Sequence, residues 1–209
     1  MSTAASPRGS RNGPRHQLKN QVNMPDRLAL YTFGVFKKPI NDPANDGFFA
    51  LDERIFPLVD RAAGMIARSG YAEEPDKSMW GEHVFPRFYV ERGDGTSPST
   101  LSLWVDVEAA MAFAYFGLHA EALKQARSWF VDPDWPPYVA WWVSADHTPT
   151  WHEATQRLEQ LHDSGPTAAA FSFKSPFDAN GCPVTIDRDR VRRYADTNAA
   201  NLKQSSPRM

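Results

Sequence analysis

The most regular pattern of apolar and polar residues lies between positions 101 and 161, where short apolar runs alternate with segments of helical spacing. The run 101–105 is apolar except for one serine, which predicts a strand. Asp106 follows it and can cap the free backbone N–H groups of a helix predicted over 107–117. Gly117 at the end of that helix suits a left-handed cap.

A second helix is predicted over 118–130, because its apolar residues form one stripe. His119 is the one ionisable residue on that stripe. The proline-rich turn 132–137 ends the helix, since proline lacks a backbone donor. The run 138–143 that follows is apolar on both faces and is predicted to be a buried strand.

The segment after this strand carries the signals of a capped helix. Thr150 and Glu153 fit a capping box, and Thr148 before Pro149 offers a second candidate cap. Gly165 marks the end of the helix.

The first hundred residues complete the order of elements. The run 28–36 is apolar on both faces and predicts a buried strand, and 48–68 predicts a helix that Pro57 kinks or breaks. The segments 87–90 and 100–105 flank a link rich in Gly, Ser and Pro, which predicts a hairpin. Strand, helix, strand, strand, helix, strand is the split βαβ pattern, so we predict an α+β, ferredoxin-like fold with an antiparallel sheet.

Such a sheet has helices on one face only, so its second apolar face needs a cover. We expect Tyr31, Phe33, Trp104 and either Trp141 or Trp142 to form that second face. A partner sheet could cover it, which predicts a homodimer that pairs as a dimeric α/β barrel around a lumen or cleft. The alternative is that the C-terminal segment or the long insertion folds back over the sheet.

Composition indicates one domain over 26–175 with two polar ends. The chain has 209 residues with 12% aromatic side chains, enough for a sizeable core. Residues 1–25 hold four basic and no acidic side chains and lack an apolar span, so we expect a disordered arm and neither a signal peptide nor a membrane segment. We expect 176–209 to be a polar tail, whose charged run forms a solvated helix or a loose arm.

Charge and cysteine content indicate which class of partner and which cellular compartment to expect. The formal net charge is −2, and the body is more acidic than the whole chain because the arm is basic, which argues against a nucleic-acid partner. The single Cys182 permits no internal disulfide and suits a reducing cytosol, so we expect a cytoplasmic protein.

Several motifs together resemble one family of uncharacterised domains. The likeness spans about 28–173 and is carried by 102–109, 119–121, 127–130, 138–143, 147–150 and 165–167. That family is similar to the dimeric α/β-barrel superfamily, which includes cofactor-independent antibiotic-biosynthesis monooxygenases and some haem-dependent enzymes. The resemblance implies the dimeric barrel fold and a small-molecule enzyme, without fixing the reaction.

His119 is the first candidate for catalysis. Burial on an apolar stripe would lower its pKa and leave a neutral imidazole that can act as a general base. The alternative is a core histidine hydrogen-bonded to a neighbour.

Substrate contacts are predicted from a loop and from the sheet. His83 and Arg87, together with Glu82, could bind an anionic or phenolic substrate, although loop polarity alone also explains them. The aromatic side chains of Tyr31, Trp104 and Trp142 could stack on a flat substrate.

No residue spacing indicates a metal or a cofactor. His147, His152 and His162 lack the spacing of a zinc helix, so no metal site is predicted, and haem is left open without a supporting motif. We therefore expect a cofactor-independent, monooxygenase-like enzyme, as in secondary metabolism, that oxygenates, isomerises, decarboxylates or cyclises a flat apolar or aromatic substrate. The alternative is a non-catalytic ligand-binding or dimerisation module.

Overall fold

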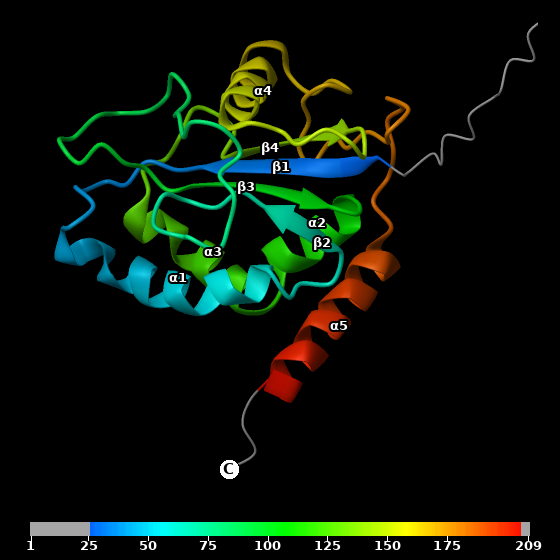
Figure 1. Ribbon diagram of the computed structural model, residues 1–209, viewed down its shortest axis with the longest axis horizontal. Helices are drawn as coiled ribbons and strands as arrows, with labels where there is room; N and C mark the ends of the chain where they lie inside the picture. Colours follow the sequence, from blue (N-terminus) through cyan, green and yellow to red (C-terminus); the bar gives the residue numbers. More distant parts are fainter. Residues whose placement is uncertain (1–25, 206–209) are drawn as a thin grey trace, which may run out of the picture.

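The computed structural model describes residues 26–205, which form a four-stranded antiparallel sheet with helices on both sides (Figure 1). The strand order is β2-β3-β1-β4, with bounds β1 (Arg27–Phe33), β2 (Met65–Arg68), β3 (Ser99–Trp104) and β4 (Tyr138–Val143). The predicted α+β class and antiparallel sheet are confirmed. The arm predicted over 1–25 lies outside the described residues.

Helices lie against both faces of this sheet. α1 (Asp46–Val59), preceded by a short 3-10 turn (Pro43–Asn45), lies on one side with α2 (Val107–Tyr115) and α3 (Gly117–Trp129), whereas α4 (Trp151–Ser164) lies on the other (Figure 1). α5 (Arg188–Ser205) packs against α2. Among the described residues, no helix is long and apolar enough to cross a membrane.

The predicted helix boundaries around β3 and β4 are confirmed by their caps. Asp106 Oδ1 accepts a hydrogen bond from the Ala109 N–H at 2.7 Å and so begins α2. Gly117 has φ +59°, the left-handed conformation predicted for it. At the start of α4, Thr150 Oγ1 accepts from the Glu153 N–H at 3.1 Å, so Thr150 rather than Thr148 is the cap.

The prediction for the second strand is wrong. The helix predicted over 48–68 ends at Val59, and 65–68 forms β2, while 87–90 lies in the irregular connection 69–98. The turn 60–64 links α1 to β2 and ends at Gly64, which has φ +81°, a conformation that side chains disfavour. A Cβ at Gly64 would lie 2.5 Å from the Ala109 Cβ, so only glycine lets the chain turn this close to α2.

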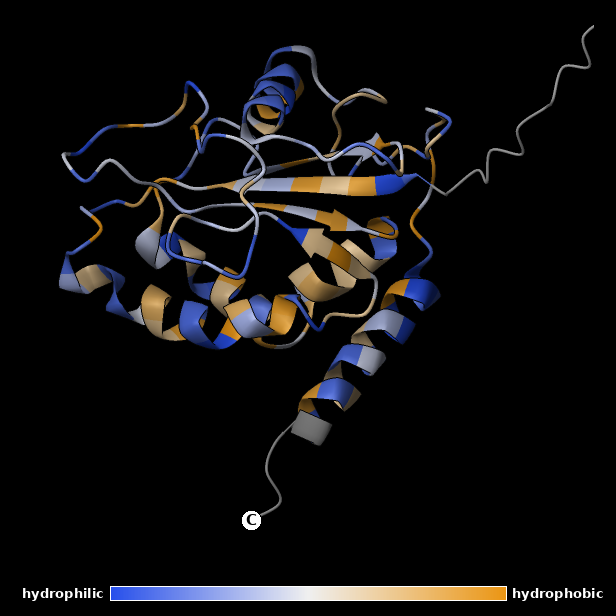
Figure 2. Ribbon diagram, in the orientation of Figure 1, coloured by the Kyte–Doolittle hydropathy of each residue, from blue (hydrophilic) through white to orange (hydrophobic). Residues whose placement is uncertain are grey.

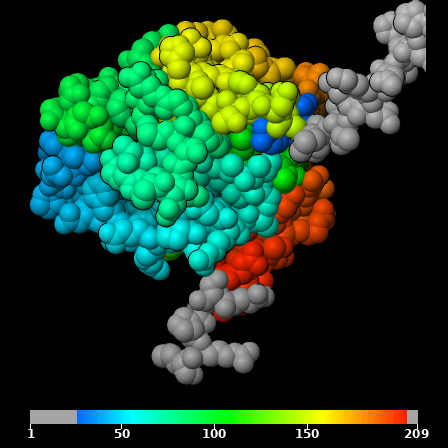
Figure 3. All heavy atoms as spheres, viewed as in Figure 1, coloured from blue at the N-terminus to red at the C-terminus, as the bar shows by residue number. Residues whose placement is uncertain are grey.

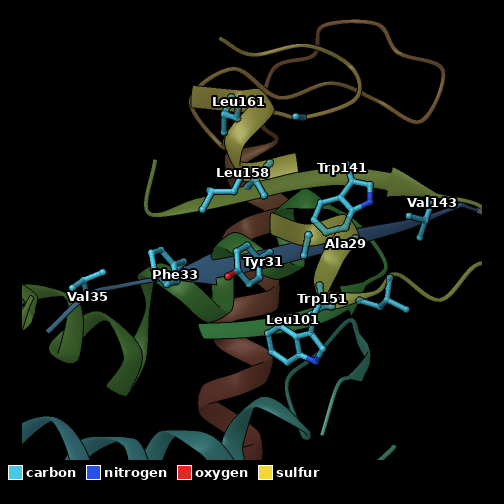
Figure 4. Packing of buried hydrophobic residues seen from close by; sticks show 14 residues of the cluster. Ala29, Tyr31, Phe33, Val35, Leu101, Trp141, Val143, Trp151, Leu158 and Leu161 are labelled. Carbon is cyan, nitrogen blue, oxygen red and sulfur yellow. The ribbon is translucent and has the colours of Figure 1, made fainter. Parts of the chain in front are cut away.

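The two faces of the sheet have separate cores. On the side of the sheet that carries α1, α2 and α3, Leu28, Leu30 and Trp104 pack with residues of α2 and with Phe171. On the opposite side, Tyr31, Leu103 and Trp141 pack with the apolar stripe of α4 (Figure 4). Figure 2 shows hydrophobic residues along the strands and mostly hydrophilic ones over α5. Tyr31 and Phe33 therefore share a face with Trp141, whereas Trp104 lies on the other face with Trp142, contrary to the prediction that Trp104 shares a face with Tyr31 and Phe33.

The second face of the sheet does not need the partner sheet that was expected to cover it. α4 and the 69–98 connection cover that face within one chain, with Tyr71, Trp80, Val84, Phe85, Phe88 and Tyr89 packed against its core. Tyr31 and Trp141 are at most 1% exposed without any partner. The alternative, in which the long insertion folds back over the sheet, is the one observed, so barrel pairing has no open face here.

The C-terminal region packs onto the domain. Phe171 exchanges backbone hydrogen bonds with Ala140 at 2.8 and 2.9 Å, which covers part of the outer edge of β4. The charged run forms a helix, which was one of the two expected structures. The helix is not fully solvated, because Val191 and Ala195 on one side of α5 are buried against α2. Cys182 lies exposed in the segment that leads to α5.

Candidate functional site

Polar side chains gather among aromatic rings on the α4 side of the sheet. Tyr31 comes from β1, Ser99 from the start of β3 and Trp151 from the first turn of α4, while the 69–98 connection supplies Tyr71 and His83. We call these five residues the His83 cluster.

His83 is held by one hydrogen bond and several rings. Its Nε2 and the Ser99 Oγ are 2.9 Å apart and hydrogen-bonded. The imidazole lies 4.3 Å from the Trp151 ring and 4.9 Å from the Phe85 ring, measured between centroids. Burial lowers the pKa of His83, and the negative charge of Glu73 opposes that shift in part. The imidazole is therefore neutral at pH 7 and can accept a proton.

Tyr31 is fully buried, and its hydroxyl has no hydrogen-bond partner in the described part of the chain. Burial raises the pKa of this phenol, and the nearby Tyr71 and Glu159 add to the shift. The hydroxyl thus stays protonated and can donate a hydrogen bond. A buried donor without a partner is rare and calls for a physical explanation.

The Trp151 indole nitrogen is a second buried donor without a partner among residues 26–205. The two rings meet edge to face, with centroids 6.1 Å apart. Figure 4 shows the Tyr31 hydroxyl and the Trp151 nitrogen pointing in different directions, so they do not serve one common acceptor.

Tyr71, and Arg87 outside the cluster, hold the 69–98 connection against the rest of the domain. Tyr71 donates its hydroxyl to the Ser99 carbonyl oxygen at 2.5 Å, and burial raises the pKa of Tyr71. Arg87 forms an exposed ion pair with Asp163 of α4, and its backbone N–H donates to Glu159 Oε1 at 2.8 Å. Arg87 therefore clips the 69–98 connection to α4, and its guanidinium is already paired.

The sequence-predicted site residues fall into two groups. Tyr31, His83 and Arg87 lie together on the α4 side. His119, Trp104 and Trp142 lie on the opposite side of the sheet, with Phe113 between the Trp104 and His119 rings.

Each member of the second group makes a hydrogen bond that explains it structurally. His119 Nδ1 is hydrogen-bonded to the Ala114 carbonyl oxygen at 2.8 Å, near the C-terminal end of α2. Burial lowers the pKa of His119, as expected for it. The Trp104 indole donates to Ser102 Oγ at 2.9 Å, and the Trp142 indole donates to the Phe177 carbonyl oxygen at 2.7 Å.

Sequence reasoning missed Ser99, Tyr71 and Trp151. Ser99 ends the link 93–99, which was predicted to be a hairpin turn, and Tyr71 follows the helix predicted over 48–68 without belonging to a predicted element. Trp151 was visible as the first apolar residue after the Thr150 cap, but its neighbours come from distant parts of the chain.

The His83 and His119 rings are packed against other aromatic rings, and the described histidines belong to no metal cluster. Haem ligation needs an imidazole nitrogen that faces an open cavity. The His83 and His119 rings instead lie 4.3 and 5.4 Å from the Trp151 and Phe113 rings. Within residues 26–205, no three His, Cys, Asp or Glu side chains are grouped to hold a metal ion.

Comparison with known protein families identifies the family of this domain. The family described as "Domain of unknown function (DUF3291)" matches residues 27–186. The chain belongs to the DUF3291 family. Its DUF3291 domain includes the sheet, α1 to α4 and the whole His83 cluster, whereas α5 follows it.

Other comparisons give no activity for the DUF3291 domain. No curated protein matches the chain. A crystal structure of a protein of unknown function from Nitrosomonas europaea is similar at 13% identity and a TM-score of 0.34, covering 59% of this chain and 93% of that one.

Proposed function

We propose that this protein is a cofactor-independent enzyme that transfers a proton to or from a flat aromatic small molecule bound at the His83 cluster. The observation that carries this proposal is the buried, unpartnered Tyr31 hydroxyl in the same aromatic cluster as a neutral histidine. Buried ionisable groups with shifted pKa values in aromatic surroundings are typical of sites of acid–base catalysis.

The two groups suit complementary roles. With Ser99 accepting a hydrogen bond from the Nε2–H of His83, the Nδ1 lone pair is the one that takes the proton. Tyr31 would donate to the substrate oxygen on which negative charge develops, which stabilises a phenolate or enolate. The proton removed from the substrate resides on His83, and the electron pair remains on the substrate.

This proton transfer suits the reactions considered for this chain. Oxygenation of a phenol, base-catalysed isomerisation and base-catalysed cyclisation begin with removal of a proton by His83, whereas in a decarboxylation the anion forms by loss of CO2 and then takes up a proton from the protonated His83. The resemblance to cofactor-independent monooxygenases supports this class of chemistry, and the proposal adds the residues. It does not require a barrel dimer, because the site lies between α4, the sheet and the 69–98 connection of one chain.

Substrate entry requires the 69–98 connection to move. The His83 ring contacts those of Tyr71 and Phe85, and both His83 and Tyr71 contact Trp151, so a flat ligand would enter by replacing some of these contacts. The Arg87–Asp163 pair that fastens the connection to α4 is exposed, and exposed ion pairs are weak. The connection could therefore act as a lid.

The test is capture of metabolites by the full-length protein, followed by assay of each hit as a substrate. We expect Tyr31→Phe and His83→Gln to lower turnover of a captured compound by at least about tenfold while the protein stays folded. His119→Asn, which keeps a donor for the Ala114 carbonyl, should leave turnover unchanged. Turnover that survives in both cluster variants, or is lost only in His119→Asn, would disprove the proposal.

A non-catalytic ligand-binding module is the second candidate, and the close contacts among the rings favour it. In that case the compound captured by the protein would be recovered unchanged. Tyr31→Phe would then weaken its binding without any reaction to measure.

A further inference from the structure

α5 forms one wall of a cleft on the side of the sheet that carries α1 and α2, away from the His83 cluster. The cleft lies where the end of α1, α2 and the C-terminal half of α5 meet. Figure 3 shows α5, in orange and red, lying against the surface near the end of α1. The lining residues are Leu58, Arg61, Ala62, Phe113, Asn198, Asn201 and Leu202.

α5 is fixed at two points along its length. Near its start, Asp106 Oδ2 accepts from the Tyr194 hydroxyl at 3.0 Å and from Arg190 at 2.5 Å. Further along, Asn198 Oδ1 accepts from the Ala63 N–H at 2.7 Å. The cleft walls are therefore held by specific bonds, although α5 lies beyond the part of the chain that matches the family.

Asn198 lines the cleft with a donor that is not used. Its Nδ2 is buried and has no partner in the described part of the chain, while its Oδ1 is engaged by Ala63. A buried donor without an acceptor is unfavourable, and a ligand oxygen would offset that cost once a small shift of the Asn198 side chain exposes the nitrogen to the cleft.

The rest of the lining is apolar apart from a cation. Leu58, Ala62 and Phe113 form an apolar surface, and the exposed Arg61 borders it. Among residues 26–205, no ion pair or side-chain hydrogen bond engages the Arg61 guanidinium. An apolar hollow bordered by a cation and an amide donor matches a molecule with an apolar body and an anionic oxygen.

We propose that this cleft binds a small monocarboxylic acid, with its carboxylate on Arg61 and the Asn198 amide and its apolar part against Phe113. A bound acid would join α1 to α5 and so hold α5 on the domain. This site is independent of the His83 cluster, which lies on the other side of the sheet.

Hexanoate is the probe for the test, with 1-hexanol as its uncharged counterpart. Titrated into isotope-labelled full-length protein, hexanoate should shift the amide signals of Ala63 and of α5 in a saturable way, and 1-hexanol should bind at least about fivefold more weakly. Saturation at equal concentrations of both compounds, or no shift at either segment, would overturn the proposal.

Two variants locate the carboxylate. Arg61→Gln should raise the dissociation constant of hexanoate at least about fivefold. Asn198→Asp keeps the acceptor for Ala63 but replaces the donor with a negative charge, and it should weaken binding similarly. Arg54→Gln removes an exposed cation elsewhere on α1 and should change nothing. Equal affinities in Arg61→Gln and Arg54→Gln would disprove the site, even if Asn198→Asp fails to fold.

Discussion

Two tyrosines on the α4 side, the buried Tyr31 and the partly buried Tyr71, differ in their hydroxyl groups: Tyr71 has an acceptor, whereas Tyr31 has none among the described residues. Tyr71→Phe should therefore lower the free energy of unfolding by about 1 kcal/mol, because a hydrogen bond is lost. Tyr31→Phe should leave it unchanged or raise it, because the desolvation cost of an unpaired hydroxyl disappears. Urea unfolding of both variants measures the difference, and a larger loss in Tyr31→Phe would contradict the unpaired state.

The pH dependence of stability follows from the lowered pKa of His83. The unfolded chain binds a proton at this residue below about pH 6.5, whereas the folded chain binds it only at a lower pH. Stability from the neutral, buried ring is thus present above about pH 6.5 and is lost as the pH falls below it.

In His83→Gln the loss of stability between about pH 7.5 and 5.5 should be smaller than in the wild type, by at most about 1.4 kcal/mol per pH unit. His152→Gln, on the exposed side of α4, serves as the control and should keep the wild-type difference. The measurement is urea unfolding at both pH values. Identical losses in the wild type and His83→Gln would show that His83 does not titrate differently on folding.

The sequence indicated part of the candidate site at this scale. Tyr31, His83 and Arg87 were predicted to contact a substrate, and all three lie on the α4 side of the sheet. The partner of His83 could not be predicted, because Ser99 is sixteen residues away across an irregular connection. His119 was expected to be buried and is partly buried, but its bond to Ala114 depends on the α2–α3 turn and could not be predicted.

At the scale of elements, local signals succeeded where one helix or strand has its own cap or stop. Asp106 and Thr150 marked the starts of α2 and α4, because a cap acts on backbone groups within the next turn, and Gly117 marked the break between α2 and α3. β2 was missed because the apolar spacing of α1 continues past Val59 into a strand of four residues. The turn 60–64 separates them, and the role of Gly64 in that turn depends on α2 lying beside it.

Gly64→Ala should therefore be costly. Positive φ and the contact with Ala109 act together, so we expect a loss of at least about 2 kcal/mol in the free energy of unfolding. Gly117→Ala shares the positive φ but has nothing within 4 Å of the added Cβ, and it should cost only about 1 kcal/mol. Equal losses in thermal or urea unfolding would show that the contact with α2 carries no cost.

At the scale of the whole molecule, both apolar faces of the sheet are covered within one chain. Folding is then independent of association, and the melting temperature should not change between about 1 and 100 µM protein. A melting temperature that rises with concentration would show that assembly contributes to stability, and would revive the homodimer, which stays a prediction.

The single thiol of this protein can affect any measurement of its association in solution. Cys182 is exposed in the segment before α5 and has no second cysteine to pair with inside the chain. Air oxidation can therefore link two chains only to each other, and the product would sediment as a dimer without any contact between the sheets. The same property makes Cys182 a single attachment point for a thiol-reactive fluorophore, placed where it would report the detachment of α5 from the domain.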